Sequence, residues 1–132
     1  MTLGLSGVGV YSTGANIVNQ KGNIKVGKTR EVTNPDGIKE FENSVGIYAA
    51  NGTKVITDNS SVINVEEANS IGIYAEGKGT DITLNGTIDA DNGGIAVLVK
   101  DGAIATNKGT ITLGGTGDNR GFKRRMFRYY RR

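Results

Sequence analysis

Ser44-Val45-Gly46-Ile47-Tyr48-Ala49 is the phrase that decides the fold, because it returns as Ser70-Ile71-Gly72-Ile73-Tyr74-Ala75 and, with substitutions, at residues 7–12 and 92–97. A second phrase follows each copy. The distance from the glycine of the first phrase to the isoleucine of the second is 15, 17, 16 and 17 residues. Self-similarity at a nearly constant period is the sequence signature of repeat architectures. The chain is therefore predicted to be a repeat protein.

Each repeat is predicted to contain three short strands. Both phrases alternate apolar residues with small or polar ones, which is the period of a half-buried strand. A third strand-like stretch lies between them, around Ile17, Val55, residues 82–84 and Ile104, bounded by residues typical of turns. Three strands in a repeat of about 22 to 26 residues are typical of one coil of a parallel β-helix, which buries its apolar face by stacking on its neighbours. We predict an all-β fold of about four coils over residues 1–119.

Aligning the repeats predicts which side chains stack from coil to coil. A polar row of Lys25, Asn64, Asp89 and Thr112 should face water. Burial of the inner rows should supply most of the stability, at roughly 1.5 to 3 kcal/mol per fully buried large side chain before entropy is subtracted. The expected inner rows are Val8/Val45/Ile71/Gly93, Val10/Ile47/Ile73/Ile95, Ser12/Ala49/Ala75/Val97, Ile24/Ile63/Ile88/Ile111 and Val26/Val65/Ala90/Leu113.

One repeat position carries the candidate binding surface. Tyr11, Tyr48 and Tyr74 share it and are expected to form an exposed aromatic ladder that is interrupted at Ala96. An aromatic row can stack on sugar rings or bind a partner. It can equally be covered by a side loop, or simply reinforce the sheet through pairing of neighbours. Both interpretations stay open at this point.

The side loop is predicted from one irregular spacing. Gly9 and Gly46 are 37 residues apart, whereas the next two intervals are 26 and 22 residues. The surplus lies in residues 28–43, which are dense in charge and contain the turn Asn34-Pro35-Asp36-Gly37. Loops that leave a repeat scaffold often carry function.

The charge of the chain divides at residue 120. The 16 Lys and Arg residues exceed the 13 Asp and Glu residues and give a net charge of +3. Seven of the basic residues lie in 120–132, which contains no acid, so residues 1–119 carry a net charge of −4. This basic aromatic tail is expected to lie outside the repeat fold. Two hypotheses account for this tail. In the first it binds nucleic acid, anionic lipid or lipopolysaccharide, and in the second it is sequence translated out of frame. No specific nucleic acid is expected as a partner.

Composition excludes several classes of protein. The 21 Gly and single Pro exclude collagen and disfavour a helical bundle, because Gly costs about 1 kcal/mol relative to Ala inside a helix. With no Cys, a disulfide framework cannot form, although the compartment stays open. Residues 1–10 lack the features of a signal peptide, and no apolar run approaches the ~20 residues of a membrane-spanning helix. We expect no export signal or membrane anchor in this chain.

Two glycine-rich motifs are expected to bind nothing. Residues 22–29 match the phosphate-binding pattern G-x-x-x-x-G-K-[ST], but that chemistry needs a helix beginning at the Lys, and residues 24–26 alternate like a strand. Residues 114–118 resemble the calcium-binding pattern G-G-x-G-x-D, but the Asp arrives one residue early and the motif occurs once. We predict neither a cofactor nor a metal site.

The acidic residues offer little support for catalysis. Asp89 and Asp91 should point to one face and could serve acid/base chemistry on a polysaccharide. However, Asp89 belongs to the polar row, Glu66-Glu67 lies at a turn, and the chain has no His. We therefore expect a solvated face and no catalytic residues.

The phrases SVGIYA and SIGIYA, with the G-T-I strands that follow, resemble the passenger region of Gram-negative autotransporter adhesins of type V secretion. The resemblance covers residues 7–114. It implies a right-handed parallel β-helix displayed at the cell surface, outer membrane or outside the cell, with a non-enzymatic structural and adhesive function. The partner it implies is a host-surface protein or glycan. Members of this family begin with a signal peptide and end with a membrane β-barrel, so the chain is expected to be a fragment that contacts the membrane only through a missing barrel.

An alternative function is kept beside this one. Parallel β-helices also occur as polysaccharide lyases, hydrolases and tail-spike-like proteins, so a carbohydrate-active β-helix is the second prediction. It requires charged residues from adjacent coils to converge in a groove.

Overall fold

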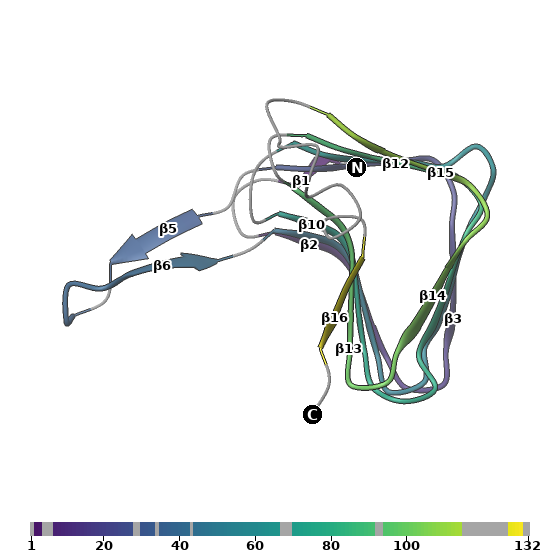
Figure 1. Ribbon diagram of the computed structural model, residues 1–132, viewed down its shortest axis with the longest axis horizontal. Coiled ribbons are helices and arrows are strands. Elements are labelled where there is room, and N and C mark those ends of the chain that lie inside the picture. The colour runs from purple at the N-terminus through teal and green to yellow at the C-terminus, as the bar shows by residue number, and fades with distance from the viewer. Residues whose placement is uncertain are drawn as a thin grey trace.

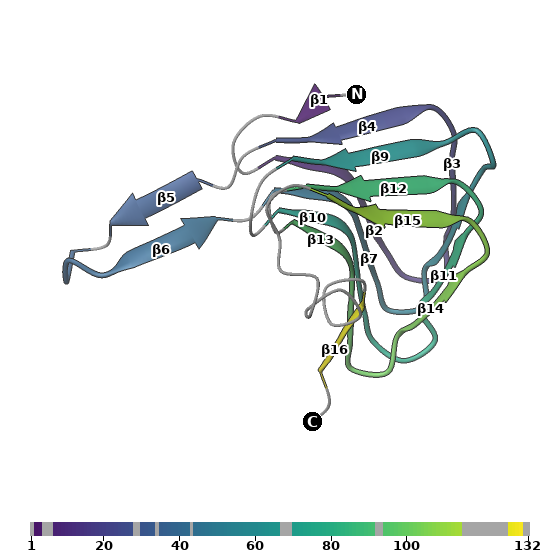
Figure 2. The same ribbon diagram turned by 45° about the horizontal axis from the view of Figure 1, so that its top comes forward.

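The repeats form a right-handed parallel β-helix of about four coils, as predicted. The computed structural model describes residues 2–3, 7–27, 30–33, 35–42, 44–66, 70–91, 94–114 and 127–130, and these residues form strands and turns without a helix. Figure 1 looks along the stack, so that each coil appears as three sides, and Figure 2 shows successive coils lying one below another.

Each coil contributes one strand to each of three parallel sheets. The hydrogen bonds of every strand therefore run to the coils before and after it, and each sheet is a stack of equivalent segments. Sheet 1 contains β2 (Val8–Thr13), β7 (Val45–Ala50), β10 (Ile71–Glu76) and β13 (Ile95–Lys100). Sheet 2 contains β3 (Ile17–Gln20), β8 (Lys54–Thr57), β11 (Asp81–Leu84) and β14 (Ile104–Asn107). Sheet 3 contains β4 (Asn23–Val26), β9 (Val62–Val65), β12 (Thr87–Ala90) and β15 (Thr110–Leu113).

Two further strands lie at the ends of the stack. β1 (Thr2–Leu3) pairs with β4 in sheet 3, and β16 (Phe127–Tyr130) pairs in parallel with β13 in sheet 1. β16 belongs to the tail expected outside the repeat fold, and its backbone adds a strand to sheet 1. Residues 120–126 and 131–132 lie outside the described residues, so the prediction for the tail as a whole stays a prediction.

The core fills the space between the three sheets. Ile47 and Ile73 of sheet 1 and Ile63 of sheet 3 are 0% exposed, and they pack with Val55 and Ile82 of sheet 2. The predicted polar row is also observed, since its members pair across β4, β9, β12 and β15 and are exposed or half-buried. Alternation of period two thus places the apolar side chains of sheet 3 inside and the polar ones in water.

The register of the fourth coil corrects one prediction. Ile71 pairs with Ile95, Ile73 with Val97 and Ala75 with Val99, so β13 is shifted by two residues from the alignment that placed Ile95 beside Ile73 and Val97 beside Ala75. A shift of two preserves the faces of a strand, which is why the alternation did not reveal it. The observed register buries Val99 completely and sets Lys100 beside Glu76. Gly93, expected in an inner row, lies outside the described residues.

The row of Val8, Val45 and Ile71 was also misplaced. Val45 and Ile71 pack in a second cluster with Leu98, separate from the core, and Val8 is largely exposed. The alternation breaks in these strands because Val45, Gly46 and Ile47 are buried in succession. A Cβ at Gly72 would lie 2.6 Å from the carbonyl oxygen of Ala96, so the backbones approach here more closely than a side chain permits.

The predicted side loop contains a β-hairpin. β5 (Arg30–Thr33) and β6 (Lys39–Glu42) pair with each other in antiparallel orientation. Figures 1 and 2 show the hairpin projecting away from the solenoid. Gly37 turns the chain with a φ of 79°, and Ile38 beside it is exposed.

Truncation of two residues of β13 tests the observed register. Val99→Ala is expected to lower the free energy of unfolding by about 1.5 to 3 kcal/mol, because it leaves a cavity in the core. Ile95→Ala is expected to cost about 1 kcal/mol or less, because Ile95 is only partly buried and packs outside the core. Urea denaturation followed by circular dichroism measures both. A larger loss for Ile95→Ala than for Val99→Ala would instead support the register predicted from the sequence.

Candidate binding site

The three tyrosines form a ladder on the outer face of sheet 1. Tyr11 pairs with Tyr48, and Tyr48 with Tyr74, on adjacent strands. The ring centroids of Tyr11 and Tyr48 are 4.9 Å apart with an interplanar angle of 6°, and those of Tyr48 and Tyr74 are 5.2 Å apart at 31°. The ladder is therefore a stack of rings whose faces point along the solenoid.

Stacking leaves one ring face open. Tyr48 has a neighbouring ring on each side, and the far side of Tyr74 is covered by the Lys100 ammonium, with its Nζ 5.6 Å from the ring centroid. A cation over an aromatic face is attracted by the ring quadrupole. Tyr11 is 68% exposed, and among the described residues it has a ring partner on one side only. Aromatic binding by this ladder is thus confined to the open face of Tyr11 and to the ring edges.

A polar network fixes the inner part of the ladder. The Tyr48 hydroxyl donates a hydrogen bond to Glu76 Oε1, and Lys100 Nζ lies 3.2 Å from Glu76 Oε2. The pKa of Tyr48 is raised above its ordinary value of 10.0, mainly by burial and secondly by the hydrogen bond to Glu76. The pKa of Lys100 is raised above its ordinary value of 10.5, mainly by its hydrogen bond to Tyr74 and secondly by its hydrogen bond to Glu76. At neutral pH the phenol is neutral and the ammonium charged, which are the states this network stabilises.

The aromatic ladder is interrupted in the fourth coil as predicted, but at Leu98 and not at Ala96. The observed register places Leu98, and not Ala96, beside Tyr74. Leu98 is buried and packs with Val45 and Ile71 against Tyr48 and Tyr74. The row therefore continues with an apolar side chain, and Tyr48 and Tyr74 pack against this apolar cluster.

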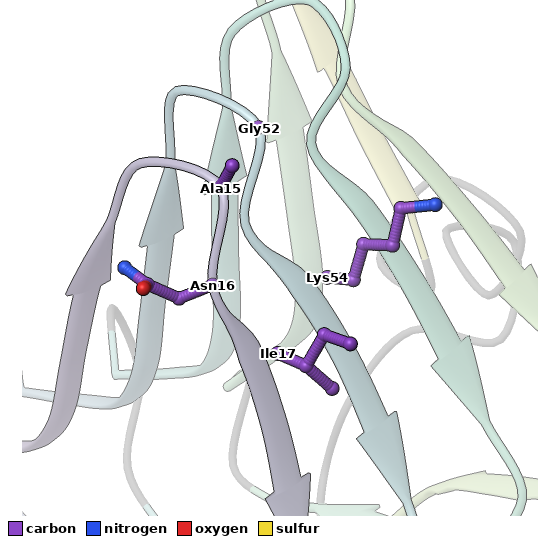
Figure 3. A pocket seen from close by; sticks show the side chains of 5 residues that line it. All are labelled: Ala15, Asn16, Ile17, Gly52 and Lys54. Carbon is purple, nitrogen blue, oxygen red and sulfur yellow. The ribbon is translucent and has the colours of Figure 1, made fainter.

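A pocket lies where sheet 1 turns into sheet 2 in the first two coils. Its volume is about 210 Å³, and it is lined by Ala15, Asn16, Ile17, Gly52 and Lys54. In Figure 3 the side chains of Ile17 and Lys54 lie near each other, whereas Asn16 points away from Lys54. Ile17 and Lys54 occupy paired positions of β3 and β8, so they share the outer face of sheet 2.

Sequence reasoning missed this pocket and the network around Glu76. Glu76 and Lys100 each lie two residues beyond a ladder position, at Tyr74 and Leu98, so the period of two places them on the same face. The period of two was sufficient to place Glu76 on the face of Tyr74. It could not place Lys100 beside Glu76, because this requires the correct register of β13. Repeat alignment carried no signal for the pocket, because a turn forms it.

The described residues of the two glycine-rich motifs do not form a phosphate-binding or metal-binding site. Residues 23–26 of the phosphate-binding match form strand β4, and Lys28 and Thr29 lie outside the described residues, as do residues 115–118 of the calcium-like match. The residues that the structure describes contain no group of three or more acidic side chains suited to a metal ion.

The acidic candidates lie in two rows of sheet 3. Asp89 lies between Asn64 and Thr112 in the polar row, so its neighbours in the adjacent coils carry no carboxylate. Asp91 N donates a hydrogen bond to the Val65 carbonyl, so Asp91 lies beside Glu66 of the preceding coil. Glu66 Oε1 in turn lies 3.1 Å from Lys25 Nζ in an exposed ion pair.

Comparison with family models, curated proteins and solved structures gave no match. In the described part of the chain there is no helix with the length and apolar character needed to cross a membrane. The ladder, the pocket and the sequence resemblance are therefore the features that bear on the function of this chain.

The network predicts a loss of stability at alkaline pH. Both pKa values are raised by folding, so the stability that they contribute is complete below pH 10 and declines above it, as the unfolded state loses protons first. Urea denaturation between pH 7 and pH 11.5 should show a falling free energy of unfolding above pH 10. Tyr48→Phe should flatten the decline, and Tyr11→Phe, the matched change at the exposed end of the ladder, should flatten it less because Tyr11 is a minor cause of the raised pKa of Tyr48. An unchanged pH profile in Tyr48→Phe would contradict the network.

Proposed function

We propose that this chain is a non-enzymatic structural and adhesive segment of a cell-surface protein of the autotransporter passenger type. The observation that carries the proposal is the aromatic ladder, which ends in one open tyrosine face on a stacked β-helix. In this proposal the parent protein is exposed at the outer membrane or outside the cell, and the segment projects a binding surface toward a host-surface protein or glycan.

The scaffold suits adhesion because it extends along one axis and holds its outer side chains at fixed spacings. Coils that stack only on their neighbours can be added without changing those already present. Tyr11 is anchored by its stack on Tyr48, at 4.9 Å between ring centroids, so little conformational freedom remains to be lost on binding. Tyrosine also combines a large apolar ring with a hydroxyl, a pairing that favours contact surfaces.

A carbohydrate-active β-helix is the second candidate, and one observation favours it. Asp89 lies in β12 and Asp91 directly follows that strand, and both are half-buried, so this pair of carboxylates lies on one face of sheet 3, where a polysaccharide could meet it. Incubation with a panel of uronate-containing and neutral polysaccharides, followed by reducing-end analysis, tests this candidate. Cleavage that is lost in Asp89→Asn would overturn the non-enzymatic proposal.

Adhesion is tested with the labelled 132-residue chain on cultured epithelial cell layers. Tyr11→Ala is expected to lower binding about tenfold, because it removes the open aromatic face, while Tyr11→Phe retains most of it. The melting temperature of Tyr11→Ala should change little, since the side chain is largely exposed. Equal binding by Tyr11→Ala and the unaltered chain would remove the ladder as the adhesive surface.

A further inference from the structure

The stacked rings of Tyr11 and Tyr48 have the geometry of two phenols that can be joined to each other. Their centroids lie 4.9 Å apart and their planes are within 6° of parallel, so the π orbitals of each ring point toward the other ring. Two phenoxyl radicals couple along these orbitals, through the carbons next to their oxygens. The direct pairing of the two residues between β2 and β7 holds the rings in this position. Such positioning makes a reaction between two groups far more frequent than their free encounter would.

Both rings have an outlet for the proton that their oxidation releases. A phenol that loses an electron becomes a strong acid, so a base that already holds the hydroxyl proton assists the step. The Tyr48 hydroxyl donates its hydrogen bond to Glu76 Oε1. Lys100 Nζ lies 3.2 Å from the other oxygen of Glu76, and this opposite charge favours the carboxylate form. Tyr11 is 68% exposed and can release its proton to water.

Tyr74 is a poorer partner for Tyr48 than Tyr11 is. The ring planes of Tyr48 and Tyr74 are tilted by 31°, so their π orbitals are less well aligned. The Lys100 ammonium lies 5.6 Å from the centroid of the Tyr74 ring. A positive charge over a ring opposes the removal of an electron from it. Coupling is therefore directed to the pair that joins the first and second coils.

We propose that Tyr11 and Tyr48 are a site of oxidative modification, at which a carbon–carbon bond joins them into dityrosine. The oxidant is hydrogen peroxide, used by a haem peroxidase. Each phenol loses one electron and one proton, and the two phenoxyl radicals join at the carbons next to their oxygens. The hydrogens on the joined carbons then move through solvent to the oxygens and restore both phenols. The two electrons and two protons that leave the protein reduce one peroxide to two waters.

This cross-link fastens the first coil to the second. The two tyrosines are 37 positions apart, and the segment between them includes the hairpin of β5 and β6. Closing such a loop restricts the unfolded chain as a disulfide does, and the chain has no Cys with which to form a disulfide. The melting temperature of the cross-linked monomer is expected to rise by about 10 °C.

The test oxidises the 132-residue chain with hydrogen peroxide and a haem peroxidase at low protein concentration, which disfavours links between molecules. The monomer is isolated by gel filtration, digested with trypsin and examined by mass spectrometry. Tyr11 and Tyr48 lie in fragments 1–21 and 40–54, whereas Tyr74 lies in fragment 55–78. We expect fragments 1–21 and 40–54 to be joined, with the fluorescence of dityrosine and a mass two hydrogen atoms below their sum. Circular dichroism of the intact monomer measures the shift in melting temperature.

Four variants identify the reacting rings and the proton acceptor. Tyr11→Phe and Tyr48→Phe should each abolish the link between these fragments, because phenylalanine has no hydroxyl to oxidise. Tyr74→Phe is the matched control on the same ladder and should retain it. Glu76→Gln keeps an oxygen that can accept the hydrogen bond but removes the base, so the initial rate of coupling should fall about tenfold or more. Circular dichroism verifies that each variant is folded before the rates are compared.

The outcomes either support the cross-link or overturn it. A link between fragments 1–21 and 40–54 that disappears in Tyr11→Phe and persists in Tyr74→Phe supports it. Absence of this link from the oxidised monomer, or a link between 40–54 and 55–78 in its place, overturns it. The result is independent of the adhesive function, because Tyr11→Phe is expected to lose the cross-link while it retains most of the binding to cells.

Discussion

Stacking of each coil on its neighbours is the constraint on which the structure depends. The inner side chains of the middle coils, such as Ile63 and Ile73, are fully buried because a coil covers them on each side. In the end coils Val10, Val18 and Leu113 are only partly buried, whereas Val26 and Val99 are fully buried where β1 and β16 extend the stack. Burial is therefore a property of neighbouring coils and not of any one repeat, so stability should be approximately a sum of interfaces.

The same stacking governs the outer surface. Side chains at one repeat position are brought about 5 Å apart, which is the spacing between strands of a sheet. Tyrosines at that distance stack, and by stacking they cover most of each other's faces. An exposed aromatic row in a β-helix is consequently less accessible than its sequence suggests, and in the described part of the chain Tyr11 is the tyrosine of the row that has one stacking partner and no cation over its ring.

Prediction from the sequence was most successful in the second and third coils. There the phrases Val45-Gly46-Ile47-Tyr48 and Ile71-Gly72-Ile73-Tyr74 are nearly identical and align without ambiguity. In the fourth coil the phrase weakens to Gly94-Ile95-Ala96-Val97, where two alignments satisfy the same period. The observed alignment, with Ile95 beside Ile71, buries Val99 and brings Lys100 into contact with Glu76. Both contacts stabilise this register, and neither can be read from the sequence of one strand.

The sequence by itself determined the fold class, the division of each coil into three strands and the position of the tyrosine ladder. These features follow from periodicity, which is local and is repeated several times along the chain. The tertiary structure alone decided how the rings of the ladder stack, how Lys100 and Glu76 join it, and that Ile17 and Lys54 line a pocket. Each of these depends on register between coils or on the path of a turn, and both are set by contacts between segments far apart in the chain.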